Sequence, residues 1–212
     1  MNITIAGAGY VGLVTGICLS SKGRNVTIVD VDEHKIGMLN EGKPPIFEKG
    51  LSELLEEYGG GMTFTTDPQK AYTDADVVML AVPTPERRDG SANLSFIYNA
   101  CGQIASYSDN GCLVAVKSTV PAGTCDKIER FFAGSGAADL FPVASNPEFL
   151  AQGTAVHDTL FPPRIVIGAE NSSDANLLKD VYAGFKCEFV MTDRKSAEMI
   201  KYASNDFLAM KI

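Results

Sequence analysis

The chain has 212 residues, 45% of them hydrophobic and 21% charged, and its formal net charge is −8. This composition is typical of a globular protein with one sizeable domain plus an extension, and an acidic chain without clusters of Lys and Arg argues against a nucleic-acid partner. Apolar runs such as residues 77–82 are too short to cross a bilayer, so no membrane partner is predicted. The N-terminus enters an apolar alternation without a secretory leader, from which we expect a cytoplasmic protein.

Apolar segments of strand length alternate with amphipathic segments of helix length along the chain. Such alternation predicts an α/β fold with a doubly wound, mostly parallel sheet. In chain order the predicted elements are strand Asn2–Ala6, helix Tyr10–Lys22, strand Asn25–Asp30, helix Asp32–Asn40, helix Lys49–Tyr58, strand Met62–Thr65, strand Asp76–Ala81, helix Ser95–Tyr107, strand Cys112–Lys117, helix Cys125–Ala133, strand Phe141–Ser145 and strand Arg164–Gly168. Gly59–Gly61 and Arg87–Asn93 carry the clearest loop signals.

Gly7, Gly9 and Gly12 form the pattern Gly-x-Gly-x-x-Gly between the first strand and the first helix. In that context Gly7 permits a tight turn, Gly9 lets the backbone approach a pyrophosphate, and Gly12 lets helix and strand pack closely. Unpaired N–H groups at the start of the helix, where Tyr10 and Val11 lie, face the anion. The pattern predicts a Rossmann-type dinucleotide site and explains how an acidic protein holds an anionic ligand.

Asp30 ends the second predicted strand at the distance from the glycines that such a site requires. Its carboxylate can accept hydrogen bonds from both ribose hydroxyls of NAD and repels the extra phosphate of NADP, so NAD is the predicted cofactor. The plainer alternative is that the glycines form only a tight turn and that Asp30 caps the next helix.

The five cysteines, at positions 18, 101, 112, 125 and 187, are widely spaced, which favours buried core residues over a disulfide framework or a zinc site. His34 and His157 are the only histidines, and neither lies in a metal-ligand spacing. We expect both to be surface or structural residues, and no metal is predicted.

Further motifs follow the predicted strands. They are Val82–Pro85 (Val-Pro-Thr-Pro), Val116–Thr124 (Val-Lys-Ser-Thr-Val-Pro-Ala-Gly-Thr), Asn146–Leu150 (Asn-Pro-Glu-Phe-Leu) and Glu198–Ala209, together with Pro45–Leu51 and Arg164–Gly168. In order and spacing, from Met1 to Ile212, the chain resembles the UDP-glucose/GDP-mannose dehydrogenase family.

The resemblance implies an NAD-dependent enzyme that oxidises the C6 alcohol of a nucleotide sugar to a carboxylate in two hydride transfers. Pro45–Leu51 is most similar to the branch that converts UDP-glucose to UDP-glucuronate, a precursor in polysaccharide biosynthesis, while GDP-mannose and UDP-N-acetylhexosamine stay open as substrates. In the family, a cysteine in a later domain carries the intermediate, and no cysteine of this chain has its sequence context. We therefore expect this chain to bind NAD and to be inactive alone.

The resemblance also implies roles for individual residues. Thr119 lies near the water and the nicotinamide, and Glu148 is a candidate base or water-orienting group in thioester hydrolysis. Lys201 and Asn205 stabilise oxyanion character on the substrate, and their spacing of four places both on one helix face. The implied cofactor contacts are Lys35, Thr84, Thr119 and Gln152, and the implied substrate contacts are Glu148, Phe149, Leu150, Lys201 and Asn205.

Each of these residues has a plainer alternative. Lys201 on its own would be a solvated helix lysine, and Glu148 a loop carboxylate. Thr84 and Thr119 could satisfy backbone groups at strand ends. Gln152 departs from the family pattern, which has a second glutamate here, and an amide can orient water or nicotinamide but cannot accept a proton.

Residues 195–212 repeat apolar side chains at helical spacing with no stop signal, as if the chain ended within a helix. We expect the dinucleotide domain over residues 1–192, the start of a connecting and dimerisation helix over 193–212, and a further domain with the catalytic cysteine; the full-length protein is expected to be a homodimer. A hydroxyacid dehydrogenase of the 6-phosphogluconate or hydroxyisobutyrate group is a second hypothesis, but it does not account for Asn146–Leu150. A third is a free-standing NAD-binding module that regulates a partner.

Overall fold

The computed structural model describes residues 1–211, and within them one sheet runs in the order β3-β2-β1-β4-β5-β6-β7-β8. Its strands are β1 Asn2–Ala6, β2 Asn25–Val29, β3 Thr63–Thr65, β4 Val77–Leu80, β5 Leu113–Val116, β6 Val143–Ser145, β7 Arg164–Gly168 and β8 Glu188–Thr192. Strands β1 to β6 are mutually parallel, β7 is antiparallel to β6, and β8 is parallel to β7. The predicted doubly wound, mostly parallel α/β fold is confirmed.

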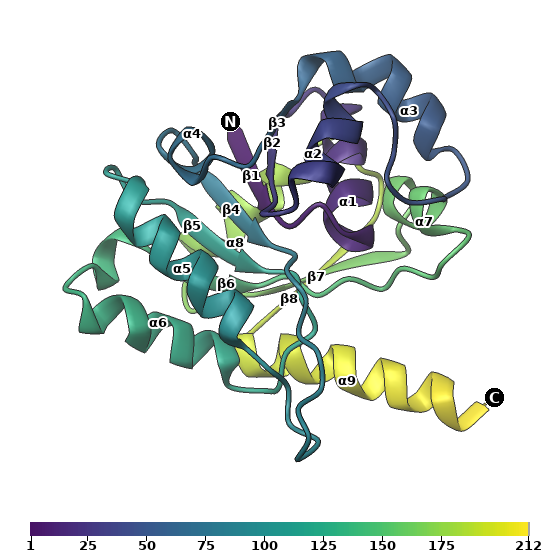
Figure 1. Ribbon diagram of the computed structural model, residues 1–212. Helices are drawn as coiled ribbons and strands as arrows, with labels where there is room; N and C mark the ends of the chain where they lie inside the picture. The colour runs from purple at the N-terminus through teal and green to yellow at the C-terminus, as the bar shows by residue number, and fades with distance from the viewer. Residues whose placement is uncertain (212) are drawn as a thin grey trace.

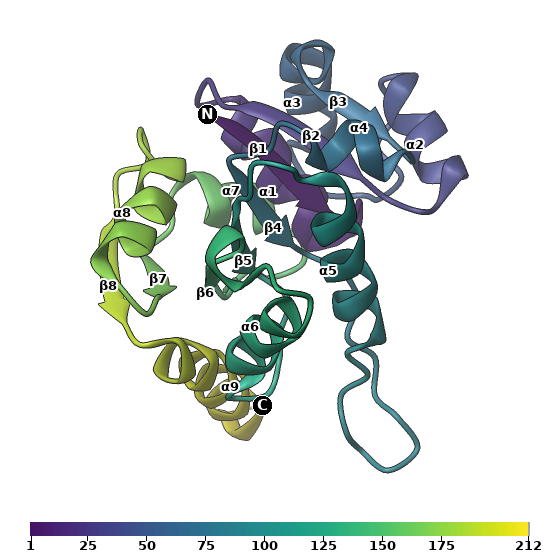
Figure 2. The same ribbon diagram turned by 90° about the vertical axis from the view of Figure 1, so that its left-hand side faces the viewer.

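Helices cover both faces of this sheet (Figure 1 and Figure 2). They are α1 Tyr10–Ser20, α2 Glu33–Asn40, α3 Leu51–Tyr58, α4 Pro68–Tyr72, α5 Ser95–Tyr107, α6 Thr124–Gly134, α7 Ala155–Leu160, α8 Ser172–Val181 and α9 Arg194–Lys211, with the short 3-10 helices η1 Gly59–Gly61 and η2 Ala138–Leu140. One buried cluster packs α1, α3, α7 and α8 on one face, and a second packs α4, α5 and α6 on the other. None of the helices in residues 1–211 is long and apolar enough to span a membrane.

The two cores follow from the alternation of side chains along each buried strand. In β4, Val77 and Met79 join one cluster, whereas Val78 and Leu80 join the other. All four side chains are shielded from solvent, which is the continuous apolar pattern of a parallel strand covered on both faces. The parallel strands end along one edge of the sheet, and the loops that carry most predicted site residues start there.

Most predicted elements are confirmed, with ends that differ by one or a few residues. The prediction of a loop at Gly59–Gly61 is wrong, because these glycines form η1, a 3-10 turn that extends α3. The sequence reasoning also missed α4, α7, α8 and β8. Asp67 caps α4 directly before Pro68, and this pairing was a helix-start signal in the sequence.

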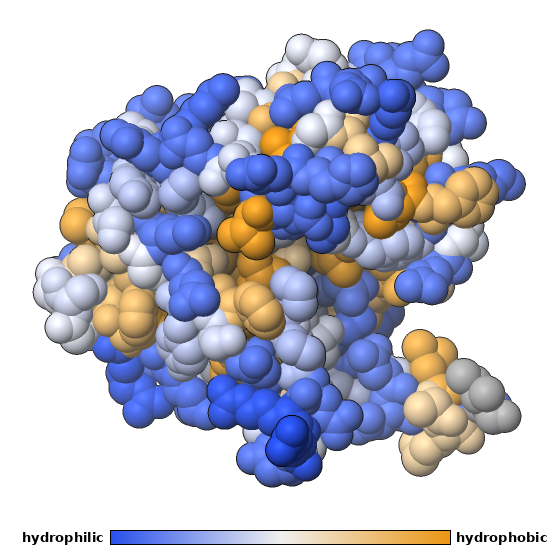
Figure 3. Space-filling view, in the orientation of Figure 1, coloured by the Kyte–Doolittle hydropathy of each residue, from blue (hydrophilic) through white to orange (hydrophobic). Residues whose placement is uncertain are grey.

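Two segments project from the body of the molecule. The loop Arg87–Asn93, closed by a bridge between Glu86 and Ala92, extends between β4 and α5 (Figure 2). The first turns of α9 pack against β6, β7 and α6, while its C-terminal half leaves the body and carries hydrophobic surface (Figure 3). Ile212, the last residue of the helix predicted over 193–212, lies outside the described residues.

Candidate functional site

The loop between β1 and α1 has glycines where a side chain would collide with backbone. Gly7 has φ +110°, and a Cβ there would lie 2.6 Å from the Ala81 carbonyl oxygen. At Gly12 a Cβ would lie 1.9 Å from the Gly7 carbonyl oxygen, whereas at Gly9 it would meet nothing within 4 Å. The fold itself therefore requires Gly7 and Gly12, while the open space at Gly9 suits a ligand that approaches the backbone.

The start of α1 faces this open space. Gly9 is the N-cap residue, and no side chain caps the helix. The N–H groups of the first turn, which begins with Tyr10 and Val11, are therefore available to an anion, and the helix dipole adds to the attraction. A pyrophosphate fits this arrangement of donors.

Asp30 follows β2 and braces the same loop. Its carboxylate accepts hydrogen bonds from the Ala8 amide at 2.6 Å and from the Asp32 amide at 2.9 Å. The alternative that Asp30 caps the next helix is wrong, because Asp32 caps α2 by accepting from the amides of His34 and Lys35. Asp30 is thus held at the end of β2, where a ribose is expected in a Rossmann-type site.

One cavity of about 270 Å³ joins these groups at the carboxyl ends of β1, β4 and β5. It is lined by Gly7, Gly9, Tyr10, Val11, Asp30, Lys35, Ala81, Val82, Pro83, Thr84, Lys117, Ser118, Thr119 and Glu148. A larger cavity of about 1070 Å³ continues from Asp30 and Lys35 to α5. Together the two cavities lie at the carboxyl ends of β2, β1 and β4, where the strand order reverses. Dinucleotides bind at this point in such sheets.

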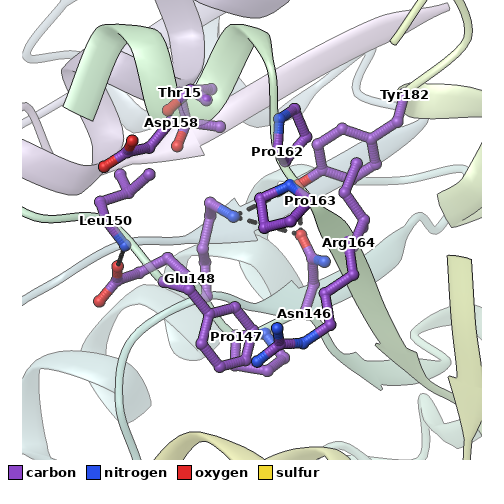
Figure 4. A pocket seen from close by; sticks show the side chains of 14 residues that line it. Thr15, Asn146, Pro147, Glu148, Leu150, Asp158, Pro162, Pro163, Arg164 and Tyr182 are labelled. Atoms are coloured by element: carbon purple, nitrogen blue, oxygen red, sulfur yellow. Dashed lines mark hydrogen bonds between the residues drawn. The ribbon is translucent and has the colours of Figure 1, made fainter. Parts of the chain in front are cut away.

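Glu148, which lines this cavity, forms an ion pair with the buried Lys201. Their Oε1 and Nζ atoms are 2.9 Å apart, and the side chains are 13% and 8% exposed. The second oxygen of Glu148 accepts from the Leu150 amide at 2.6 Å (Figure 4). The Phe149 ring contacts two cations, with its centroid 5.4 Å from the Lys201 ammonium and 4.9 Å from the Arg164 guanidinium.

Glu148, Phe149 and Leu150 also line a neighbouring cavity of about 220 Å³, which Figure 4 shows from close by. Its walls come from α1, the loop after β6, α7 and the start of β7. The ion pair brings together Glu148 and Lys201, which belong to motifs about fifty positions apart in the sequence.

Lys117 is part of the site, and the sequence reasoning missed it. Its side chain is buried, and its ammonium donates to Asn146 Oδ1 at 3.4 Å and to the Tyr182 hydroxyl at 3.3 Å. Tyr182 also donates to Asn146, and the Asn146 amide donates to the Val166 carbonyl. Burial lowers the pKa of Lys117 to about 8, although the nearby Glu148 carboxylate opposes that shift. The alternation of β5, in which every second residue points to this face, was the signal that could have found it.

Glu48 is a second feature that the sequence reasoning did not single out. Its buried carboxylate accepts from the Tyr10 hydroxyl, from the Gly153 amide at 2.8 Å and from the Ala155 amide at 3.1 Å. Burial and the hydrogen bond to Glu48 raise the pKa of Tyr10 to about 12. One carboxylate thereby joins the start of α1 to the loop that follows Leu150.

Several predicted residues lie apart from these cavities. Gly12 lines neither and serves packing instead, and Gln152 is exposed outside both. Asn205 is exposed on α9, whereas Lys201, one turn earlier, is buried. The Thr84 hydroxyl donates to the Thr119 carbonyl at 2.9 Å, so the plainer role of satisfying backbone groups is also present.

The cysteines and histidines take no part in the site. Four cysteines are buried and Cys187 is half-buried, as expected of core residues. Burial raises the pKa of Cys101 to about 12 and so keeps that thiol protonated. His34 and His157 are exposed, and the described part of the chain contains no group of three or more His, Cys, Asp or Glu side chains that could hold a metal ion.

The fold and the site define a dinucleotide-binding domain of the Rossmann type. Its features are a glycine loop before an uncapped helix, the Asp30 carboxylate after β2, and a cavity where the strand order reverses. Residues 1–186 match the family model described as UDP-glucose/GDP-mannose dehydrogenase family, NAD binding domain. The chain belongs to this family, and its cofactor is NAD.

The chain is similar to known proteins over its full length. UDP-glucose 6-dehydrogenase YwqF of Bacillus subtilis (strain 168) is 46% identical over 215 residues, which cover 100% of this chain and 49% of that protein. A UDP-glucose dehydrogenase from the hyperthermophilic archaeon Pyrobaculum islandicum and a GDP-mannose dehydrogenase from Pseudomonas aeruginosa each superpose with a TM-score of 0.94 at 37% identity, over 100% of this chain and 50% of theirs. The chain thus spans about half the length of these relatives.

Proposed function

We propose that this chain is the NAD-binding part of a UDP-glucose 6-dehydrogenase, in which the complete protein oxidises UDP-glucose to UDP-glucuronate with two NAD molecules. The observation that carries this proposal is the ion pair between Glu148, which lines the cavity of about 270 Å³, and the buried Lys201. Relatives named for UDP-glucose support the choice of substrate. GDP-mannose and UDP-N-acetylhexosamine are the alternatives within the same family.

The cofactor contacts follow from the geometry of the first cavity. The amides at Gly9, Tyr10 and Val11 hold the pyrophosphate, while Asp30 accepts from the adenosine ribose. Lys35 adds a positive charge beside that ribose. Thr84 and Thr119, in the loops after β4 and β5, then flank the nicotinamide half. We assign residues 1–192 to the NAD domain and 193–212 to the start of a connecting helix.

Bound NAD supplies the hydride acceptor for the C6 alcohol. Lys201 stabilises the negative charge that develops on the substrate oxygen, and Asn205, one turn further along α9, is the second donor. Glu148 holds the Lys201 ammonium in place before the substrate enters and is the group that can take the alcohol proton. Phe149 and Leu150 form the apolar wall against the sugar.

Helix α9 is proposed as the connecting and dimerisation element of a homodimer. Its exposed large apolar side chains are Met199, Phe207, Leu208 and Met210, and such a surface on one helix is typical of a contact site. All five cysteines are free thiols, which fits a reducing compartment, and we propose that the protein acts in the cytoplasm.

The test is an assay of NADH formation by the longest protein that the gene encodes, with each of the three nucleotide sugars. We expect about two NADH per UDP-glucose, because an alcohol is oxidised to a carboxylate. Lys201→Ala should lower kcat roughly 100- to 1000-fold, whereas Lys195→Ala, a mostly exposed lysine on the same helix, should change it little. If only GDP-mannose or UDP-N-acetylhexosamine is turned over, that sugar nucleotide is the substrate instead of UDP-glucose. NAD binding without turnover of any of the three would favour an NAD-binding module that regulates a partner.

A further inference from the structure

Lys117 and Glu148 line both the cavity of about 270 Å³, here called the nucleotide cavity, and the neighbouring cavity of about 220 Å³ that Phe149 also lines. Lys117 directly follows β5, and Glu148 lies in the loop after β6, so the two residues follow neighbouring strands. They form the wall between the two cavities. Any charge on this wall acts on a ligand in the nucleotide cavity through protein rather than through bulk water.

The charges on this wall do not cancel. The Glu148 carboxylate is paired with the Lys201 ammonium at 2.9 Å. The hydrogen-bond partners of the Lys117 ammonium, Asn146 and the Tyr182 hydroxyl, are neutral, and no ion pair among residues 1–211 includes Lys117. One uncompensated positive charge therefore remains on the cavity wall after β5, which β1 and β4 separate from β2 and Asp30.

With the ribose of the adenosine half at Asp30 and the pyrophosphate at Gly9, the end beside Lys117 receives the nicotinamide. The oxidised nicotinamide ring is positively charged and the reduced ring is neutral. A fixed cation therefore repels only the oxidised form, while its attraction to the phosphates is the same for both and cancels in their ratio.

We propose that Lys117 is a specificity-determining residue that makes this site bind NADH in preference to NAD⁺, and so favours transfer of hydride to the bound cofactor. The inference rests on the proposed placement of NAD. It assigns a function to a buried lysine that the hydride-transfer geometry of Glu148, Lys201 and Thr119 does not use.

The preference depends on pH. The pKa of Lys117 is lowered to about 8 by burial, so its positive charge is present below that pH and is lost above it. The titratable groups that face it are Glu148, with Lys201 behind it, and Tyr182, whose pKa is raised by burial so that its hydroxyl stays neutral. The preference for NADH should therefore fade as the pH rises through about 8.

The experiment is calorimetric titration of the chain with NAD⁺ and with NADH at about pH 6.5 and about pH 9.5. In the unchanged chain, the ratio of the NAD⁺ Kd to the NADH Kd should fall roughly three- to tenfold between the two pH values. Lys117→Met removes the charge and should give the low ratio at both. Lys127→Met removes a charge from the exposed face of α6 and should leave the ratio and its pH dependence unchanged.

Equal ratios at both pH values in the unchanged chain would overturn the proposal, and so would equal ratios in Lys117→Met and the unchanged chain. If Lys117→Met does not fold, Lys117→Gln removes the same charge and keeps a hydrogen-bonding group. The comparison of the two pH values in the unchanged chain needs no variant. If neither NAD⁺ nor NADH binds, the proposed nucleotide site itself fails. That result differs from normal binding with an unaltered ratio, in which only the role of Lys117 fails.

Discussion

At the scale of single residues, the glycines of the first loop separate into two roles. A side chain at Gly7 or Gly12 would collide with backbone, whereas one at Gly9 would enter open space. The same residue type thus serves folding at two positions and ligand access at the third. Sequence spacing alone suggested these roles, but only the distances to Ala81 and to the Gly7 carbonyl separate them.

Gly12→Ala should therefore affect mainly stability, and Gly9→Ala mainly NAD binding. Gly12→Ala should lower the free energy of unfolding by about 2–3 kcal/mol, because the new methyl group has to displace backbone. Gly9→Ala should leave that free energy within about 0.5 kcal/mol and still weaken NAD binding tenfold or more, because its methyl group fills space that the pyrophosphate needs. Urea unfolding and NAD titration of both variants measure this, and a stable Gly12→Ala with normal binding would contradict the account.

Sequence reasoning found the residues whose role depends on local pattern and missed those whose role depends on distant partners. Gly7, Gly9 and Asp30 were predicted because their spacing repeats a known loop. Lys117 and Glu48 were not, because their partners lie 29 or more residues away and a single sequence does not show such contacts. The exposed position of Asn205 on α9 neither supports nor contradicts its predicted role, which stays a prediction.

At the scale of elements, Glu48 ties the start of α1 to the loop before α7. Burial alone would raise the pKa of Glu48, but hydrogen bonds from Tyr10, Gly153, Ala155 and Lys49 outweigh it and hold the pKa below its usual range. A lowered pKa contributes stability that is present above the unfolded-state value of about 4.3 and is lost as the pH falls through the folded-state value.

Glu48→Gln should lower the free energy of unfolding by about 1–3 kcal/mol at neutral pH, because an amide cannot accept all the hydrogen bonds that the carboxylate accepts. The variant should also lose less stability than the unchanged chain between about pH 7 and about pH 3. Glu53→Gln, on the exposed side of α3, makes the same charge change and should have little effect. Urea unfolding across this pH range measures the free energy of unfolding of each chain. Parallel plots of that free energy against pH for Glu48→Gln and the unchanged chain would refute the stabilising role of the Glu48 carboxylate.

Helix α9 is attached to the sheet by buried charge. Arg194, 6% exposed, pairs with Asp126 and Glu129 of α6, each at 3.0 Å, and with Glu170 after β7 at 3.2 Å. One turn further on, Glu198 accepts from the Gly123 and Cys125 amides at the start of α6. These contacts fix the first turns of α9 and so place Lys201 against Glu148.

Arg194→Met should destabilise the chain by about 2–4 kcal/mol, because three carboxylates lose their common partner. Hydrogen exchange of the α9 amides should accelerate at the same time. Lys195→Met removes a mostly exposed partner of Asp126 and should cost under about 1 kcal/mol. Equal effects of the two substitutions on stability would show that α9 is held in another way.

Most of the elements in the first two thirds of the chain were predicted, whereas α4, α7, α8 and β8 were missed. The strands β1 and β7 and the helix α5 have the predicted bounds. Helix α4 has five residues and β8 is a partly exposed edge strand, so neither has enough apolar repeats to stand out.

At the scale of the whole molecule, an acidic chain of net charge −8 offers local dipoles to an anionic cofactor at the start of α1. The donors lie at the start of α1, and the Asp30 carboxylate follows β2, the next strand along the chain and a direct neighbour of β1. Helix α9 and the cavity that Phe149 lines lie beside that site. This arrangement places the proposed chemistry at the edge of the NAD domain, towards whatever supplies the rest of the sugar-nucleotide site.

The most direct test of the central claim is calorimetric titration of the chain with NAD and with NADP. We expect NAD to bind and NADP to bind at least tenfold more weakly, because the Asp30 carboxylate accepts from the ribose hydroxyls and repels a phosphate in their place. Failure to bind NAD, or equal affinity for the two cofactors, would contradict the assignment of Gly9 and Asp30 to the cofactor site.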